Sequence, residues 1–425
     1  SFSKIYEHFY KKNLELEKVT QEKLKGEWIK YQNGNEADTL VSSLHGKGTE
    51  WCIRGYSTAK GFLENGNIYI YYTRDEHSSL SIPRLAIRMK RGKISEIRGV
   101  YDDNQNVETE LIEILEEKLK DFEYQEEIQT KLDNLKKIRE LLNKKKYEIE
   151  FNAEDLRFLY CYEKEIDIFG YNEDNRINIL KEGRNLRKDF AKVYNCKEDK
   201  IALTVDDLRN NNCLVYVGNL NLCAVNDIDD IHIPKYVLGD LDLSALTSSK
   251  GLENLAIVKG DLRLFNVKEV NSLSNLIEVG GNLYLRDLKS SCGLNNLRIV
   301  ERGAHFPSLI DASYLNNLTY IGEIANFMEL VNSKGLENLE EIGWNAKFDN
   351  LKDASGLCNL KKVGWSASFM QLENPNGLQK LETIYKDAFF PKIESENSIN
   401  EFIKIGGVKK FKEKTLIKKE LSRNN

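Results

Sequence analysis

The residues best suited to covalent chemistry lie around Cys52, in a segment bounded by Gly48 and Gly55. A thiol becomes a nucleophile when a nearby cation lowers its pKa, and Arg54 lies two residues away. A nucleophile also needs a base, and no pattern brings the nearest histidine, His45, to the sulfur. Two interpretations of Cys52 stay open, a catalytic nucleophile and a buried structural thiol, and the residues favour the second.

A second group of residues suits contact with phosphate and bases. Arg84, Arg88 and Lys90 alternate along one predicted strand, and Tyr69 and Tyr71 alternate along the strand before it. If both sets face the same side of the sheet, cations interleave with aromatic rings, as in sites that bind phosphate and stack bases. Nucleic acid or a nucleotide is then a candidate partner, and a solvated sheet face is the alternative. The candidate set also includes Arg54 and Tyr56.

A sequence repeat of 21 residues runs through the second half of the chain. Two apolar columns keep this step: Val258, Val279, Val300, Ile321, Ile342, Val363 and Ile384, and Leu255, Leu276, Leu297, Leu318, Leu339, Leu360 and Leu381. A fixed period of this length indicates a solenoid, in which each coil buries its apolar side on its neighbours. Asn254 and Asn275 begin a column of asparagines that we expect to bond backbone groups from coil to coil.

Each coil contains a short Leu-x-Leu strand whose middle residue points outward. In later coils this pair becomes Ala-x-Phe, which roughly keeps the interior volume. Near the middle of the solenoid the outward positions combine arginine with aromatic rings, a composition favoured at protein interfaces. These positions are Arg263, Phe265, Tyr284, Arg286 and His305. They predict a strip that binds a protein partner, and a solvated sheet face is again the alternative.

The motifs for metals and cofactors are weak. Asp102-x-Asn104-x-Asn106 has the spacing of a calcium loop, but Val107 stands where that loop requires glycine. The sequence also contains no phosphate-binding loop, dinucleotide fingerprint, HExxH or Ser-centred elbow. We therefore expect no metal and no cofactor, and we favour a protein without enzymatic activity.

Hydrophobic periodicity outlines the framework that positions these residues. Apolar residues at helical spacing predict a helical lead-in over residues 1–31. Helices are also predicted at 57–64 and 107–122, strands at 68–73, 83–90 and 94–100, and a hairpin turn at Arg91-Gly92. The predicted fold is an α+β domain (1–123), a helical connector that also covers the first coil (124–213), a leucine-rich, right-handed β-helix-like solenoid of about nine coils (214–391) and a basic helical cap (392–425).

Composition limits the class of protein and the cellular compartment that we expect. The sequence has 425 residues, a formal net charge of −5 and 41% hydrophobic residues. No apolar run approaches the ~20 residues that a membrane-spanning helix needs. The seven cysteines are odd in number and form no C-x-x-C, which argues against a disulfide framework. We expect a cytoplasmic protein that does not enter a membrane.

Two resemblances add to these predictions. The repeat resembles receptor L-domain-like leucine-rich coils, whose phrase is close to G-L-x-N-L-x-x-I-x-G-x-L-x-L, and this implies a surface that binds partners. The N-terminal domain resembles the PcfJ-like family of proteins associated with mobile elements and conjugation, and uncharacterised proteins of small-genome uncultivated bacteria. The residues that carry the PcfJ-like resemblance are Cys52-x-x-x-Tyr56, Gly66-x-Ile68, Arg74, Pro83-x-x-Ala86-Ile87, Ile94-x-x-Ile97-x-Gly99 and Asn104. Trp51 departs from that pattern, which has histidine before the cysteine.

Two functions follow from these observations. The first is a scaffold that binds a protein partner through the solenoid, with an N-terminal domain that binds nucleic acid or a nucleotide. The alternative is an enzyme or toxin whose N-terminal domain acts through Cys52, with the solenoid directing it to a target.

Overall fold

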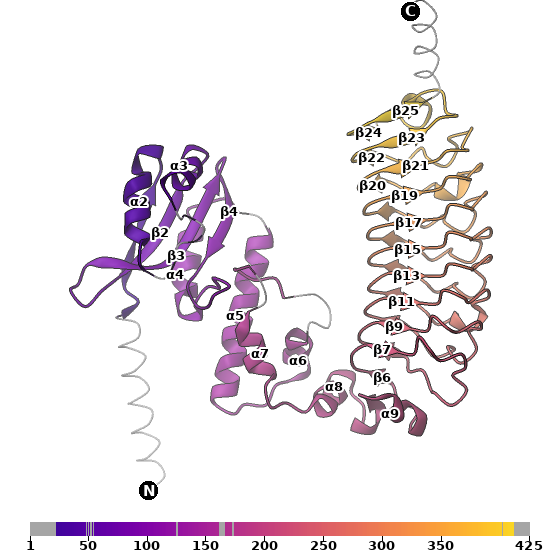
Figure 1. The fold of residues 1–425 in the computed structure, drawn as a ribbon, viewed down its shortest axis with the longest axis horizontal. Coiled ribbons are helices and arrows are strands. Elements are labelled where there is room, and N and C mark those ends of the chain that lie inside the picture. Colours follow the sequence, from indigo (N-terminus) through magenta and orange to yellow (C-terminus); the bar gives the residue numbers. More distant parts are fainter. Residues whose placement is uncertain are drawn as a thin grey trace, which may run out of the picture. The chain divides into compact units, whose positions relative to one another are not determined.

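The computed structural model describes residues 23–411, apart from residues 48, 50, 52, 54, 125, 161–165, 172–173 and 402. The chain divides into two compact units, residues 1–193 and 194–425 (Figure 1). The division falls within the segment 124–213, for which a helical connector was predicted. The first unit is an α/β domain and the second is a parallel β-solenoid.

A four-stranded antiparallel sheet forms the centre of the first unit. Its strands, in the order β1-β2-β3-β4, are β1 (Gly26–Tyr31), β2 (Ile68–Arg74), β3 (Leu80–Lys90) and β4 (Lys93–Arg98). Arg91 and Gly92 join β3 to β4, and both have positive φ, 51° and 79°, as a two-residue hairpin requires. This confirms the predicted turn. The predicted lead-in helix is wrong over β1, because Trp28 and Ile29 pair with β2 and this tertiary pairing overrides the helical spacing.

Each face of this sheet carries its own hydrophobic cluster. On one face, Ile70 and Ala86 pack with residues of α2 (Ala37–Leu44) and α3 (Tyr56–Glu64). On the other, Leu85 and Ile87 pack with residues of α4 (Ile112–Leu119) and α5 (Glu126–Lys146). The alternation of strand side chains divides the apolar residues between the two clusters. The sheet is therefore a central layer with helices on both sides.

Shorter helices complete the first unit and begin the second. They are η1 (Gly34–Glu36), η2 (Thr109–Leu111), α6 (Ala153–Leu159), α7 (Asn175–Lys181), α8 (Leu186–Tyr194), η3 (Glu198–Lys200) and α9 (Val205–Asn210). Within the described ranges, no helix has both the length and the apolar character needed to cross a membrane.

The second unit is a solenoid with two parallel sheets (Figure 1). From β6 onward, paired strands are 21 residues apart, whereas β5 and β6 are 14 residues apart. The predicted repeat is thus confirmed. The first sheet contains β5 (Ile201–Ala202), β6 (Val215–Tyr216), β8 (Tyr236–Val237), β10 (Ile257–Val258), β12 (Glu278–Val279), β14 (Ile299–Val300), β16 (Tyr320–Ile321), β18 (Glu341–Ile342), β20 (Lys362–Val363), β22 (Thr383–Ile384) and β24 (Lys404–Ile405). The second contains β7 (Leu220–Asn221), β9 (Leu241–Asp242), β11 (Leu262–Arg263), β13 (Leu283–Tyr284), β15 (Ala304–His305), β17 (Ala325–Asn326), β19 (Ala346–Lys347), β21 (Ala367–Ser368), β23 (Ala388–Phe390) and β25 (Lys409–Phe411). Short turns of 3₁₀ helix lie at η4 (Asn271–Leu273), η5 (Ser355–Leu357) and η6 (Glu396–Ser398).

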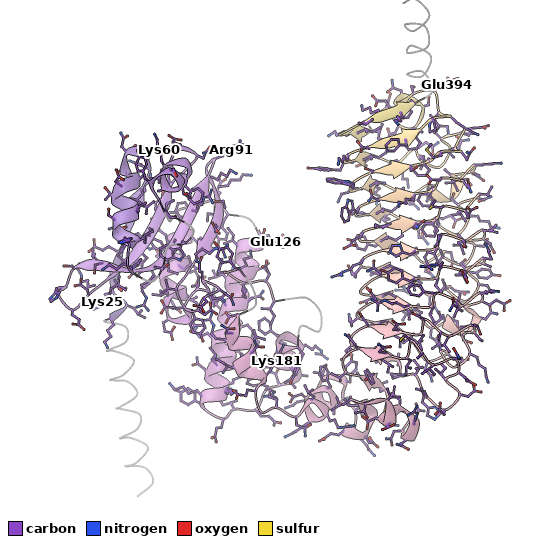
Figure 2. All side chains as sticks on the ribbon, in the orientation of Figure 1. Lys25, Lys60, Arg91, Glu126, Lys181 and Glu394 are labelled. Atoms are coloured by element: carbon purple, nitrogen blue, oxygen red, sulfur yellow. The ribbon has the colours of Figure 1, made fainter. Side chains whose placement is uncertain are left out.

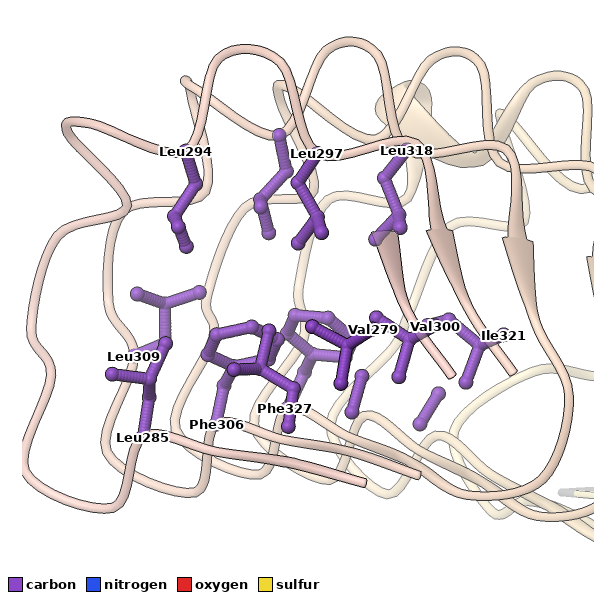
Figure 3. Packing of buried hydrophobic residues seen from close by; sticks show 14 of the residues in the cluster. Val279, Leu285, Leu294, Leu297, Val300, Phe306, Leu309, Leu318, Ile321 and Phe327 are labelled. Carbon is purple, nitrogen blue, oxygen red and sulfur yellow. The ribbon is translucent and has the colours of Figure 1, made fainter. Parts of the chain in front are cut away.

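The interior of the solenoid is filled by columns of identical or similar side chains. Val279, Val300 and Ile321 form one row, and Phe306 and Phe327 lie side by side next to it (Figure 3). The phenylalanine rings stack 5.3 Å apart between centroids. Because adjacent coils bring the same position into contact, the change from Leu-x-Leu to Ala-x-Phe leaves every layer filled.

The predicted asparagine column links the coils through hydrogen bonds. Asn275 Nδ2 donates to the carbonyl oxygen of Glu253 at 2.7 Å, and Asn317 Nδ2 donates to that of Asn295 at 2.6 Å. The equivalent bonds of the other coils start from Asn296, Asn338 and Asn359. Each amide therefore satisfies a turn carbonyl of the preceding coil, which is the structural role expected from the sequence.

The solenoid extends beyond residue 391, where its end was predicted. β22 pairs with β24, and β23 pairs with β25, both at the same 21-residue step. Phe411 stacks on Phe390 with 5.5 Å between ring centroids, so it continues the interior column. The predicted helical cap is wrong for this part, because these buried contacts outweigh the helical tendency of its lysine-rich sequence. The rest of the predicted cap, residues 412–425, lies outside the described residues.

Candidate functional site

Two of the predicted site residues, Cys52 and Arg54, lie outside the described part of the chain. Their neighbour Trp51 is buried, and its Nε1 donates to the carbonyl oxygen of Gly99 at 2.9 Å. Trp51 has a φ of 38°, in the left-handed region that large side chains rarely adopt. The nearby Tyr56 begins α3 and is exposed.

The structure does not bring the predicted cations and tyrosines of β2 and β3 to one surface. Tyr71 is buried in the hydrophobic cluster that includes residues of α4 and α5. Its hydroxyl donates to the carbonyl oxygen of Leu24 at 2.8 Å. Tyr69 packs on that same face, 5.1 Å from Phe122 between ring centroids. The guanidinium of Arg88 lies 3.5 Å from the ring centroid of Phe62, on the opposite face.

The two remaining residues of that candidate set are also accounted for. Arg84 lies where the register of β2 and β3 shifts, and its Nε donates to a carboxylate oxygen of Glu108 at 2.7 Å. Lys90 is exposed at the end of β3. Sequence alternation could not foresee the arrangement, because the pairing partner and the register shift were unknown.

The five predicted residues of the second sheet do lie together. We call Arg263, Phe265, Tyr284, Arg286 and His305 the partner strip; they project from or just after β11, β13 and β15. Neighbouring strands in register place the same position of successive coils side by side. Figure 2 shows that side chains project outward along the whole length of the solenoid.

Aromatic contacts hold the partner strip in one arrangement. The rings of Phe265 and Tyr284 meet edge to face with centroids 5.5 Å apart. Tyr284 stacks on His305 with centroids 4.6 Å apart and planes at 9°. The guanidinium of Arg286 lies 5.2 Å from the centroid of Phe265. Rings ordered in this way lose little conformational freedom when a partner covers them.

The two arginines of the partner strip differ in their ion pairs. Arg263 pairs with Asp240 at 3.3 Å and with Asp261 at 2.5 Å, so two carboxylates balance its charge. Arg286 is exposed, and within the described residues no carboxylate pairs with it. A free guanidinium over an aromatic ring is suited to an anionic group of a partner.

Burial changes the acid–base properties of the two stacked rings. Desolvation lowers the pKa of His305 below 6.5, and the nearby Lys347 lowers it further. Desolvation also raises the pKa of Tyr284 above 10. Both rings are therefore uncharged near pH 7, and the strip presents a flat apolar centre with arginines beside it.

The calcium-like spacing of Asp102, Asn104 and Asn106 forms a turn. Asp102 Oδ1 accepts the backbone N–H groups of Asn104 at 3.1 Å and Asn106 at 3.2 Å. In the described part of the chain, no cluster of three or more His, Cys, Asp or Glu side chains could hold a metal ion.

Sequence reasoning missed one exposed cluster. Trp344 and Trp365 occupy equivalent positions in successive coils, in the turns that connect a strand of the first sheet to a strand of the second. Tyr385 lies in the corresponding turn of the next coil. The repeated Gly-Trp pairs at the 21-residue step were the signal that could have found it.

No family model, curated protein or solved structure matches this chain.

Proposed function

We propose that this protein is a non-enzymatic interaction protein whose solenoid binds a protein partner through the partner strip. The observation that carries the proposal is the contact series in which Arg286 lies over Phe265, Phe265 meets Tyr284, and Tyr284 stacks on His305. Arginine and tyrosine dominate the energetics of many interfaces. An ordered cluster of these residue types on a rigid sheet supports a binding role.

The charges of the strip suggest the chemistry of the partner. Arg263 is balanced by Asp240 and Asp261, so its guanidinium serves mainly to hold the strip. Arg286 has an exposed charge available for a carboxylate. We therefore propose that the partner inserts an apolar side chain against Tyr284 and places an Asp or Glu near Arg286.

The test uses the full chain as bait and identifies captured proteins by mass spectrometry. The variant Tyr284→Ala/Arg286→Ala removes the centre of the strip. Tyr314→Ala/Arg298→Ala is the matched control, since both residues are exposed elsewhere on the solenoid. A partner that is captured by the native chain and the control, and lost with the strip variant, supports the proposal. Equal capture by all three proteins would disprove it, provided that circular dichroism shows all three folded.

We propose that helices α5 to α9 connect the α/β domain to the solenoid, that the repeat is of the leucine-rich kind and that the N-terminal domain is PcfJ-like. A reducing, cytoplasmic setting is supported by Cys196, Cys223, Cys292 and Cys358, none of which forms a disulfide within the described residues. For the N-terminal domain, nucleic-acid binding rests on sequence alone, since Tyr71 is buried and Arg88 lies on the other face.

A further inference from the structure

Aromatic side chains gather outside the solenoid, where strands of the first sheet lead into strands of the second. Trp344 lies between β18 and β19, Trp365 between β20 and β21, and Tyr385 between β22 and β23. The ring centroid of Trp365 is 6.2 Å from that of Trp344 and 6.3 Å from that of Tyr385. Trp344 is 44% exposed and Tyr385 is 67% exposed. We call these three residues, together with Lys386 and Lys404, the aromatic corner.

Packing of the solenoid does not account for the aromatic corner. In these coils Ile342, Val363 and Ile384 fill the interior and are fully buried, whereas the three rings lie outside it. Backbone bonds hold the coils together here: the N–H of Trp365 donates to the carbonyl oxygen of Trp344 at 2.9 Å. Trp344 and Tyr385 are therefore available to a ligand, with the partly exposed Trp365 between them, and large exposed aromatic groups mark interaction sites.

Lysines accompany the rings. Lys386 Nζ lies 4.4 Å from the ring centroid of Trp365, and within the described residues neither Lys386 nor Lys404 pairs with a carboxylate. Thr383 pairs with Lys404 of the next coil and with Lys362 of the previous one, so lysines flank the strand that leads to Tyr385.

Acidic groups also lie near the aromatic corner. Lys362 is balanced by Glu341 at 2.6 Å, and Asp387 Oδ1 accepts the N–H of Val408 at 2.8 Å. Glu323 occupies the coil before Trp344, since its carbonyl oxygen accepts the N–H of Trp344. Asp387 and the exposed Glu382 keep their negative charges, so the patch is of mixed sign. Lys386 and Lys404 are the groups on it that can meet an anionic ligand.

We propose that the aromatic corner binds single-stranded nucleic acid, with bases against the rings and phosphates beside Lys386 and Lys404. Such a strand repeats a planar apolar face and an anion along its length, and the corner repeats a ring from coil to coil with lysines alongside. A duplex hides the faces of its bases within the stack. A protein partner is disfavoured, because lysine is depleted at the centre of protein interfaces.

The experiment measures fluorescence anisotropy of a labelled oligo-dT of about 20 nucleotides with the full chain. We expect binding in about 50 mM NaCl, weakened about sevenfold in about 200 mM NaCl if two phosphates are neutralised. Trp365→Ala/Tyr385→Ala should weaken binding by about 5- to 150-fold, the loss expected for one stacked base. Tyr314→Ala is the matched control, because Tyr314 is an exposed tyrosine outside the corner.

Several outcomes would overturn the proposal. They are an absence of binding at low salt, unchanged affinity in Trp365→Ala/Tyr385→Ala, and equal affinity for duplex DNA of the same length. Lys386→Glu gives a second measurement, since it should reduce the salt dependence without removing a ring. The strip variant Tyr284→Ala/Arg286→Ala should keep oligonucleotide affinity, so failure here is distinct from failure of the protein-partner proposal. Circular dichroism verifies that each variant is folded.

Discussion

The ring of His305 lies parallel to the ring of Tyr284, with 4.6 Å between their centroids and 9° between their planes. The two residues are paired outward positions of β15 and β13. Desolvation in this stack is the largest cause that lowers the pKa of His305, and Lys347 adds to it, while Asp261 and Glu323 act in the opposite sense. The stack therefore couples the order of the partner strip to the protonation of one histidine.

This coupling predicts a pH-dependent stability. The folded-state pKa of His305 lies below 6.5, so the unfolded chain takes up the proton first as the pH falls. The stability that neutral His305 contributes is present above pH 6.5 and is lost as the pH falls from there through the folded-state pKa. We expect the free energy of unfolding to decrease more between about pH 7.5 and about pH 5 in the native chain than in His305→Asn.

Urea unfolding at the two pH values measures this difference. His232→Asn is the control, because His232 is exposed in the same unit and should leave the pH effect in place. If His305→Asn shows the same decrease as the native chain, the stack with Tyr284 does not disfavour protonation.

The partner strip could be predicted because two simple periods determine it. The 21-residue step places Arg263, Tyr284 and His305 in successive coils, and the alternation of strand residues turns them outward. The ion pairs of Arg263 could not be foreseen, since they depend on how Asp240 and Asp261 are oriented beside the strand.

Other parts of the fold required information that lies far away in the sequence. Trp28 pairs with Tyr71, and this long-range pairing turned a predicted helix into β1. Alternation within each strand shows which side chains share a face of that strand, but not whether Tyr71 of β2 and Arg88 of β3 lie on the same face of the sheet. Register decides that question, and it depends on the pairing of β2 with β3 and on the shift near Tyr71.

The asparagine column gives a second prediction. Asn317 Nδ2 donates to the carbonyl oxygen of Asn295 at 2.6 Å, and Asn317→Ala removes this donor from a turn. We expect the free energy of unfolding to decrease by about 1 kcal/mol, the usual net value of such a bond. Asn316→Ala is the matched control, because Asn316 is the exposed neighbour and should change stability by less than about 0.5 kcal/mol. If Asn317→Ala and Asn316→Ala change the free energy of unfolding equally, the asparagine column does not stabilise the stack of coils.

The third prediction concerns a buried ion pair in the first unit. The side chains of Arg176 and Asp174 are 2% and 1% exposed, with 2.5 Å between Arg176 Nη2 and a carboxylate oxygen of Asp174. Arg176 Nη2 also donates to the carbonyl oxygen of Val107 at 2.8 Å, and it thereby ties α7 to the segment before α4. Arg176→Met would leave the Asp174 carboxylate buried without a cation, at an expected cost of about 3–5 kcal/mol.

Removing both charges should cost less than removing one. In Asp174→Asn/Arg176→Met, the asparagine can still cap α7 and no uncompensated charge stays buried, so we expect recovery of part of the lost stability. Arg74→Met is the control, because the Arg74–Glu27 pair is exposed and is worth about 0–1 kcal/mol. Urea unfolding followed in the helical region of the circular dichroism spectrum reports mainly on this unit, where the longest helices lie. A double variant no more stable than Arg176→Met would show that the guanidinium acts through Val107 and packing, because charge balance would then contribute nothing measurable.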